Sequence, residues 1–259
     1  MRTSISQTFA RLRREGGKAF IPYVMAGDPS IGRSREIVLL FEKCGADIVE
    51  LGVPFSDPLA DGPIIQRAAE RSLRQGTSLR SVISFVREVR GATQIPIVLM
   101  TYFNPVFRYG PSDFIRDARG AGVDGVVIPD LPPEEATDFV RSARRLRLDT
   151  IFLLAPTSTE ERIRKVVHYS SGFIYYVSIT GITGAELLLD GSMERSIAQI
   201  RQRTTMPIAV GFGVSTPDEA AHVARLSDGV IVGSAIVKRL GDTRESLERY
   251  LTALRQAIA

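Results

Sequence analysis

The stretch ADIVELGVPFSDPLADGPII, residues 46–65, joins an apolar run to an acidic, proline-rich loop. The run 47–51 is rich in β-branched residues and stops at Gly52, which predicts a buried strand. Because side chains alternate along a strand, Glu50 faces the same side as Ile48. If the neighbouring side chains pack outward on helices, the Glu50 carboxyl points inward at the end of the strand. A carboxylate there is costly unless it is partnered or has a function.

The loop that follows carries two more acids, Asp57 and Asp61. Pro54, Pro58 and Pro63 restrict its backbone, since proline fixes one of the two backbone dihedrals. Three carboxyl groups around one stiff turn indicate an acid–base site rather than an ordinary solvent-exposed loop.

Outward from this stretch, the chain repeats apolar runs that alternate with helical patterns. Strands are expected at 18–27, 47–51, 95–100, 124–128, 150–154, 173–177, 207–210 and 229–232. Helices are expected at 33–43, 64–74, 79–89, 111–119, 133–146, 159–169, 193–203, 217–225, 233–240 and 244–258. The third strand is expected to continue as extended chain through 101–105. Continuous apolar runs are typical of parallel strands that are buried on both faces.

Eight such units predict an α/β fold, a single (β/α)8 TIM barrel over residues 1–259, with a short phosphate-binding helix after strand eight. A doubly wound open sheet is the alternative, but that fold usually carries a glycine fingerprint after its first strand, where this chain has AGDPS at 26–30. Ile5, Phe9 and Leu12 follow helical spacing and predict an extra N-terminal helix packed on the core. An N-terminal transit peptide is the competing interpretation of that segment.

Composition excludes several classes of protein. The chain has 259 residues, 44% of them hydrophobic, and a net charge of +4. We expect no membrane contact, since no apolar run approaches the roughly 18 residues of a membrane span. Nucleic acid is not expected as a ligand, because no aromatic residues accompany the arginine cluster at 141–147. The single cysteine, Cys44, excludes an internal disulfide framework and favours the cytoplasm.

In a barrel of this kind the functional residues lie at the C-terminal ends of the strands. The polar candidates there are Asp28, Glu50, Asp57, Asp61, Tyr102, Asp130 and Tyr175. The loops of the last three strands contain Thr183-Gly184, Gly211-Phe212-Gly213 and Gly233-Ser234. Glycine-rich loops after strands seven and eight, followed by a short helix, predict a phosphate site in which backbone N–H groups hold the anion.

Lysines and histidines are missing from these strand ends. Lys18 opens a strand, and Lys43, Lys165 and Lys238 lie in predicted helices, which argues against a Schiff-base lyase. Both histidines also lie in predicted helices, which argues against a zinc or iron centre. A Mg²⁺ site between Asp57 and Asp61 stays open at this point. The chemistry expected is therefore general acid–base catalysis by carboxyl groups on a phosphorylated substrate.

Several motifs in order along the chain resemble the tryptophan synthase alpha chain family. They are FIPYVMAGDP (20–29), ELGVPFSDPLADGPIIQRA (50–68), TYFNPVFRYG (101–110), GVVIPDLPPEE (125–135), TGITGAE (180–186), VGFGVS (210–215) and VGSAIV (232–237). The resemblance implies retro-aldol cleavage of indole-3-glycerol phosphate to indole and glyceraldehyde 3-phosphate, with no cofactor and no metal in this chain. It implies that Glu50 protonates the indole ring and helps to remove the glycerol hydroxyl proton. It implies that Asp61 accepts the indole N–H.

The resemblance also implies a set of substrate-binding residues. The phosphate cradle would consist of Gly184, Gly213, Gly233 and Ser234, with Thr183 meeting the aspartate when its loop closes. The indole pocket and its surroundings would consist of Tyr23, Met100, Tyr102, Val127, Leu153, Tyr175 and Phe212. Tyr23 stands where a phenylalanine is common, and the run 187–189 is more apolar than expected for the closing loop.

The family implies a partner, the beta chain, a PLP enzyme that receives indole through a channel in an αββα assembly. The docking surface would consist of Pro54, Asp57, Pro58, Leu59, Asn104, Pro105, Phe107, Pro132 and Pro133.

Three alternatives stay open. A stand-alone lyase would carry the same motifs and release free indole. A phosphate-binding barrel isomerase would need an acid after strand five, where this chain has Leu154-Ala155-Pro156. A barrel that only regulates the beta chain would not need both Glu50 and Asp61.

Overall fold

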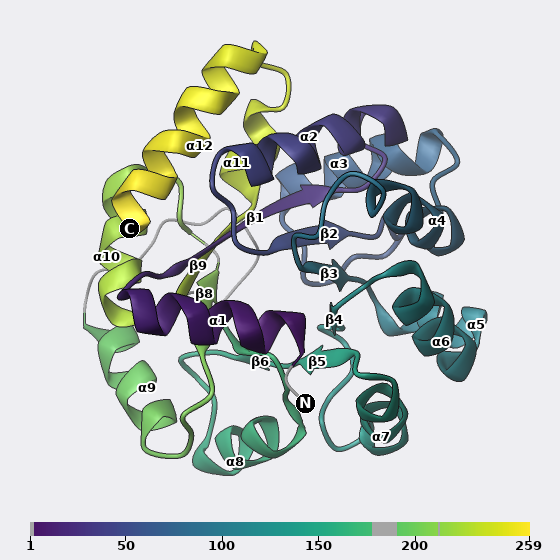
Figure 1. Cartoon of the computed structure of the whole chain (residues 1–259). Coiled ribbons are helices and arrows are strands. Elements are labelled where there is room, and N and C mark those ends of the chain that lie inside the picture. The colour runs from purple at the N-terminus through teal and green to yellow at the C-terminus, as the bar shows by residue number, and fades with distance from the viewer. Residues whose placement is uncertain (1–2, 178–190, 212) are drawn as a thin grey trace.

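The structure, a computed structural model, describes residues 3–177, 191–211 and 213–259. Parallel strands form a central ring, and helices surround it (Figure 1). This arrangement confirms the expected barrel. Thr183 and Gly184, the run 187–189 and Phe212 lie outside the described residues.

The strands are β1 (Ala19–Met25), β2 (Val49–Gly52), β3 (Ile97–Met100), β4 (Gly125–Val127), β5 (Asp149–Ile151), β6 (Leu153–Leu154), β7 (Ile174–Val177), β8 (Ile208–Gly211) and β9 (Gly229–Val232). Their order is β5-β4-β3-β2-β1-β9-β8-β7-β6. The strand expected at 150–154 is therefore split at Phe152, with β5 pairing to β4 and β6 pairing to β7. The Phe152 carbonyl accepts a 3.1 Å hydrogen bond from the Tyr175 N–H at this split. Because β5 and β6 stand at opposite ends of the strand order and are consecutive in the chain, residues 149–154 close the sheet into a barrel.

The helices are α1 (Ser4–Glu15), α2 (Ile31–Lys43), α3 (Pro63–Arg74), α4 (Leu79–Val89), α5 (Phe103–Tyr109), α6 (Pro111–Ala121), α7 (Thr137–Leu146), α8 (Glu160–Tyr169), α9 (Ser192–Arg201), α10 (Pro217–Leu226), α11 (Ser234–Arg239) and α12 (Arg244–Ile258). The expected extended chain at 101–105 is wrong. Helix α5 begins at Phe103, whose N–H donates to Asp130 Oδ1 at 2.8 Å, so an acid from the next loop satisfies the start of this helix. The helix expected from 133 begins at Thr137, because Pro132 and Pro133 first form a turn with the residues after them.

Two apolar layers separate the inside of the barrel from its outside. Val49 and Leu51 belong to the outer layer between strands and helices, and Ile48 belongs to the inner layer. Glu50 alternates with Val49 and Leu51 and therefore faces inward, as expected. Tyr23 pairs with Glu50 across the β1–β2 ladder, so both side chains lie at the same level of the barrel.

Helix α1 lies across the N-terminal end of the barrel, in front of the strands in Figure 1. Ile5, Phe9 and Leu12 are buried, and the Phe9 ring lies 5.7 Å from that of Phe173. The Thr3 hydroxyl caps the helix by accepting from the Ser6 N–H. The expected packed helix is confirmed. With this end filled, the cavity described below lies towards the opposite end.

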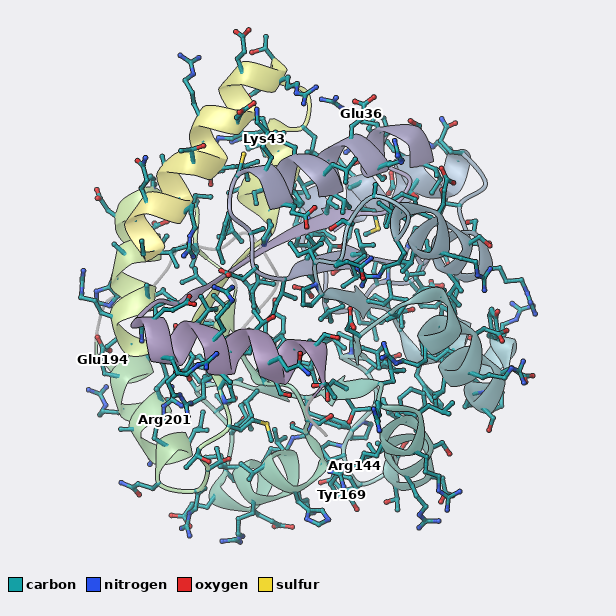
Figure 2. All side chains as sticks on the ribbon, in the orientation of Figure 1. Glu36, Lys43, Arg144, Tyr169, Glu194 and Arg201 are labelled. Atoms are coloured by element: carbon teal, nitrogen blue, oxygen red, sulfur yellow. The ribbon has the colours of Figure 1, made fainter. Side chains whose placement is uncertain are left out.

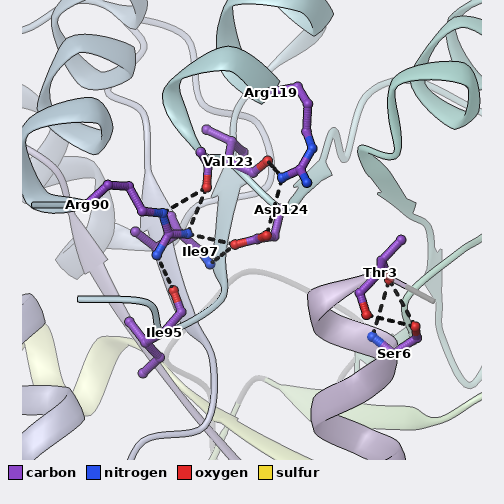
Figure 3. Close-up of polar contacts among 9 residues, drawn as sticks. Thr3, Ser6, Arg90, Ile95, Ile97, Arg119, Val123 and Asp124 are labelled. Atoms are coloured by element: carbon purple, nitrogen blue, oxygen red, sulfur yellow. Dashed lines mark hydrogen bonds and ion pairs between the residues drawn. The ribbon is translucent and has the colours of Figure 1, made fainter. Parts of the chain in front are cut away.

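Asp124 and Arg90 join α4 to the starts of β3 and β4 (Figure 3). Arg90 Nη2 donates to Asp124 Oδ2 at 2.6 Å, and its other nitrogens donate to the carbonyls of Ile95 and Gly122. Asp124 Oδ2 also accepts from the Ile97 N–H at 3.0 Å. Both side chains are largely buried, so the two charges compensate each other, and Arg119 Nη1 adds a second cation 3.4 Å from Asp124 Oδ1.

Charged side chains such as Glu36, Lys43 and Arg144 lie on the surrounding helices, away from the barrel interior (Figure 2). In the described part of the chain, no helix combines the length and apolarity needed to cross a membrane.

Replacing Arg90 with alanine should lower the free energy of unfolding by about 3 kcal/mol, since it removes the nearer of two cations from a buried carboxylate and leaves two carbonyls without their guanidinium donor. The matched control is Arg87→Ala on the same helix, where the side chain is exposed and the change should stay within about 0.5 kcal/mol. Urea unfolding of both variants measures this. Equal stability of the two variants would show that the Arg90–Asp124 pair does not hold the strands.

Candidate active site

A cavity of about 330 Å³ opens at the C-terminal ends of the strands. Seven residues expected in the site line it: Tyr23, Asp61, Met100, Tyr175, Gly213, Gly233 and Ser234. One end is acidic and aromatic, with Asp61 beside Tyr175. The other end consists of the backbone of Gly213 and the start of α11. The structure therefore brings the expected acid and the expected phosphate loops into one cavity.

Glu50 lies in the barrel interior next to this cavity and is only 2% exposed. Neither carboxyl oxygen has a hydrogen-bond partner among the described residues. Burial, reinforced by the nearby charge of Asp61, raises the pKa of Glu50 to about 8. At neutral pH this group therefore holds its proton, which is the state that a general acid needs.

Asp61 is 4% exposed and, unlike Glu50, has a hydrogen-bond donor, the Tyr102 hydroxyl. Burial raises the pKa of Asp61 to about 6, while a hydrogen bond from the Tyr102 hydroxyl lowers it. The same hydroxyl accepts from the Ala60 N–H at 3.1 Å and so holds the acidic loop in place. Asp61 is therefore mostly ionised at neutral pH beside a protonated Glu50, which divides the two roles between the two acids.

Two tyrosines flank the acids, each above a glycine on the neighbouring strand. A methyl group at Gly52 would collide with the hydroxyl of Tyr23, and one at Gly211 would lie 2.6 Å from the hydroxyl of Tyr175. Burial raises the pKa of both tyrosines well above its ordinary value, so both hydroxyls keep their protons. Because Gly52 and Gly211 have no side chain, two neutral hydroxyl groups fit near Glu50.

The expected apolar lining is only partly present in the cavity. Met100 lines it, whereas Val127 is fully buried in the barrel interior and Leu153 is partly buried against the same inner layer. Tyr102 also does not line the cavity, because it lies behind Asp61 and contacts the Phe55 ring at 5.4 Å. Tyr102 therefore acts on the site through Asp61.

The remaining acids at the strand ends have structural partners. Asp28 forms a two-fold hydrogen bond with Arg71, both at 2.7 Å, and Asp130 satisfies the start of α5. Asp57 is exposed and accepts from the Ser56 hydroxyl. No three His, Cys, Asp or Glu side chains within residues 3–177, 191–211 and 213–259 are grouped to hold a metal ion.

Nine residues that were not among the expected site residues also line the cavity: Ile64, Ile65, Val214, Ser215, Thr216, Ile231, Ala235, Lys238 and Arg239. Ile64 and Ile65 come from the first turn of α3, directly after the acidic loop. Lys238 and Arg239 come from the last turn of α11, one helical turn beyond Ser234, so helix spacing from the predicted phosphate helix could have identified them. The Arg239 guanidinium lies 4.1 Å from the centre of the Tyr250 ring, which holds it near the glycine end.

Replacing Glu50 with glutamine should remove a pH-dependent loss of stability. The pKa of Glu50 is raised in the folded state to about 8, so the native protein binds its proton more tightly than the unfolded chain. Wild-type stability therefore falls as pH rises from about 4.5 to about 8, by on the order of 5 kcal/mol. Urea unfolding at about pH 5 and about pH 9 should show the stability of Glu50→Gln rising relative to that of the wild type by most of this amount, about 4 kcal/mol. A constant difference between the two proteins would contradict a raised pKa.

The family model, the related sequences and the solved structures that resemble this chain all belong to one family. A family model described as "Tryptophan synthase alpha chain" matches residues 9–258. The alpha chain of Geobacter sulfurreducens is 50% identical, over 98% of both chains, and that of Geotalea uraniireducens is 49% identical, over 98% of this chain and 97% of the relative.

Solved structures give the same answer for the fold. A chain of Mycobacterium tuberculosis tryptophan synthase superposes with a TM-score of 0.94 at 36% identity, covering 100% of this chain and 99% of its own. Tryptophan synthase subunit alpha of Legionella pneumophila superposes with a TM-score of 0.91, also at 36% identity, over 100% of this chain and 99% of its own. The chain therefore belongs to the tryptophan synthase alpha chain family.

Proposed function

We propose that Glu50 is the general acid and base, and Asp61 the ring-stabilising carboxylate, of the lyase reaction of this family. That reaction cleaves indole-3-glycerol phosphate to indole and glyceraldehyde 3-phosphate. The observation that carries the proposal is the pair of buried acids with separated pKa values, about 8 for Glu50 and about 6 for Asp61. Separated values of this kind assign the acid and the base of a carboxyl pair.

The proposed reaction returns Glu50 to its starting state. Protonated Glu50 gives its proton to C3 of the indole ring, and the ring becomes positively charged. Ionised Asp61 accepts the ring N–H and stabilises that charge. The bond between C3 and the glycerol side chain then breaks, and its electrons restore the aromatic ring. The Glu50 carboxylate takes the proton of the glycerol hydroxyl as the aldehyde forms.

We place the phosphate of the substrate at the glycine end of the cavity. Ser234 and Ala235, the first two residues of α11, have N–H groups without an acceptor inside the helix, whereas those of Ile236 and Val237 donate to the Gly233 carbonyl. Gly213 and Gly233 bring further backbone to the same end without side chains. Gly184, Thr183 and Phe212 are assigned to the substrate on the family resemblance alone. Tyr23, Met100 and Tyr175 are placed against the indole and its side chain, with Val127 and Leu153 behind them and Tyr102 holding Asp61.

We propose the beta chain as the partner and, as the docking surface, the loop after β2 and helix α5 after β3, together with Pro132 and Pro133 after β4. Leu59 in the loop and Phe107 in α5 are 85% and 66% exposed, and exposed apolar side chains of this size often mark protein interfaces. The proposal gives PLP to the beta chain and no cofactor to this chain. It also treats residues 1–259 as a single domain acting in the cytoplasm, on the strength of the family.

Replacing Glu50 with glutamine should lower the rate of indole release from indole-3-glycerol phosphate by at least about 10²- to 10⁴-fold, because the proton donor is lost and the size of the side chain is kept. Glu88→Gln is the matched control, since Glu88 is an exposed glutamate on α4. Each protein is assayed alone and with a beta chain. Full activity in Glu50→Gln would refute the mechanism, and wild-type activity that ignores the beta chain would instead identify a stand-alone lyase.

The pH dependence of kcat/KM should be bell-shaped. It should rise as Asp61 ionises near pH 6 and fall as Glu50 loses its proton near pH 8. Tyr102→Phe removes the hydrogen bond that lowers the pKa of Asp61, so the acidic limb should move to higher pH while the alkaline limb stays in place. An acidic limb that does not move would show that Tyr102 does not act through Asp61.

A further inference from the structure

A second cavity, of about 500 Å³, lies between α3 and α11 beside the substrate cavity. Its polar lining consists of Asp28, Arg67, Arg71 and Lys238. Ile64 and Lys238 line both cavities, so the two spaces adjoin each other. We call this second cavity the α3–α11 groove.

The wall of the groove on the α3 side is firmly held. Asp28, which is 2% exposed, binds the Arg71 guanidinium through both of its oxygens at 2.7 Å. The Ser72 hydroxyl donates to the Ala26 carbonyl at 2.6 Å and fixes the same turn of helix to the end of β1. Arg71 is thus oriented by a buried acid and still half exposed, at 48% of its side chain.

The other two cations of the groove have no ion-pair partner within the described part of the chain. Arg67 lies one helical turn before Arg71, so the two guanidinium groups share a face of α3, where like charges destabilise the helix. Lys238 faces them from α11. Three cations and one carboxylate leave a net charge of +2 (3 − 1) in the groove. A phosphate monoester, with a charge near −2, would balance it.

We propose that the α3–α11 groove is a second phosphate-binding site, held by Arg67, Arg71 and Lys238, next to the substrate cavity. Guanidinium groups bind phosphate oxygens in pairs, and Lys238 lines both cavities. The inference rests on the proposed function in one respect, that the substrate is a phosphate ester. The phosphate in the groove is either that of the substrate before it enters the cavity or a free phosphate ion.

The first arm of the test measures how fast the substrate binds. The chain has no tryptophan, so the indole fluorescence of indole-3-glycerol phosphate reports binding directly. Stopped-flow association is measured in the Glu50→Gln background, which should bind the substrate without cleaving it. Adding Arg67→Gln should lower the association rate constant by about three- to tenfold at about 20 mM salt, and the difference should vanish at about 300 mM.

Two further variants give the controls for this arm. Arg87→Gln removes the same charge from an exposed site on α4 outside both cavities and should leave the rate within about twofold. Arg67→Lys keeps the charge and should restore most of the rate. Indole release by Glu50→Gln would refute the proposed function, while the comparison of association rates would still stand.

The second arm titrates the full-length chain with inorganic phosphate in a calorimeter. The wild type should bind phosphate at two sites and Arg67→Gln at one, with the site at the start of α11 unchanged. A change in association rate identifies the substrate as the source of the phosphate, and the loss of one titration site identifies free phosphate. The proposal is overturned if Arg67→Gln and Arg87→Gln behave alike in both arms.

Discussion

The carboxyl group of Glu50 is buried inside the barrel among apolar and aromatic side chains. The rest of the site follows from the cost of burying that group. Its carboxyl oxygens have no hydrogen-bond partner among the described residues, so the native fold favours the protonated form. The pairing of β2 with β1 and β3 keeps the side chain from turning outward, because a slip of one residue would expose Glu50 to the outer helices. The fold thus holds an acid in the state that the reaction requires.

The difference in pKa between Glu50 and Asp61 comes from the loops around them. Asp61 lies on a loop that the Tyr102 hydroxyl holds through Ala60, and the same hydroxyl donates to its carboxylate. This polar contact keeps the pKa of Asp61 near 6 while that of Glu50 is near 8. Two carboxyl groups within one barrel can therefore serve as proton donor and negative charge at the same pH.

Much of the fold and the position of Glu50 were predictable from the sequence, because the alternation of side chains along a strand and the residues that form turns are local signals. The inward direction of Glu50 followed from the apolar residues beside it, and the barrel followed from eight apolar runs. Helix α5 was missed because Asp130, which satisfies its start, comes from a different loop. The break at Phe152 arises from pairing with strands on opposite sides. Lys238 was missed although it lies four residues after Ser234 on the expected phosphate helix, so helical spacing would have placed both side chains on one face.

The central claim is that Glu50 is protonated at neutral pH, and a direct titration of that carboxyl group tests it. The protein is prepared with ¹³C-labelled glutamate side chains, and the Glu50 signal is assigned as the one that disappears in Glu50→Gln. The account predicts that this signal titrates near pH 8, well above the other glutamates. Titration near 4.5, the ordinary value for a glutamate, would contradict it.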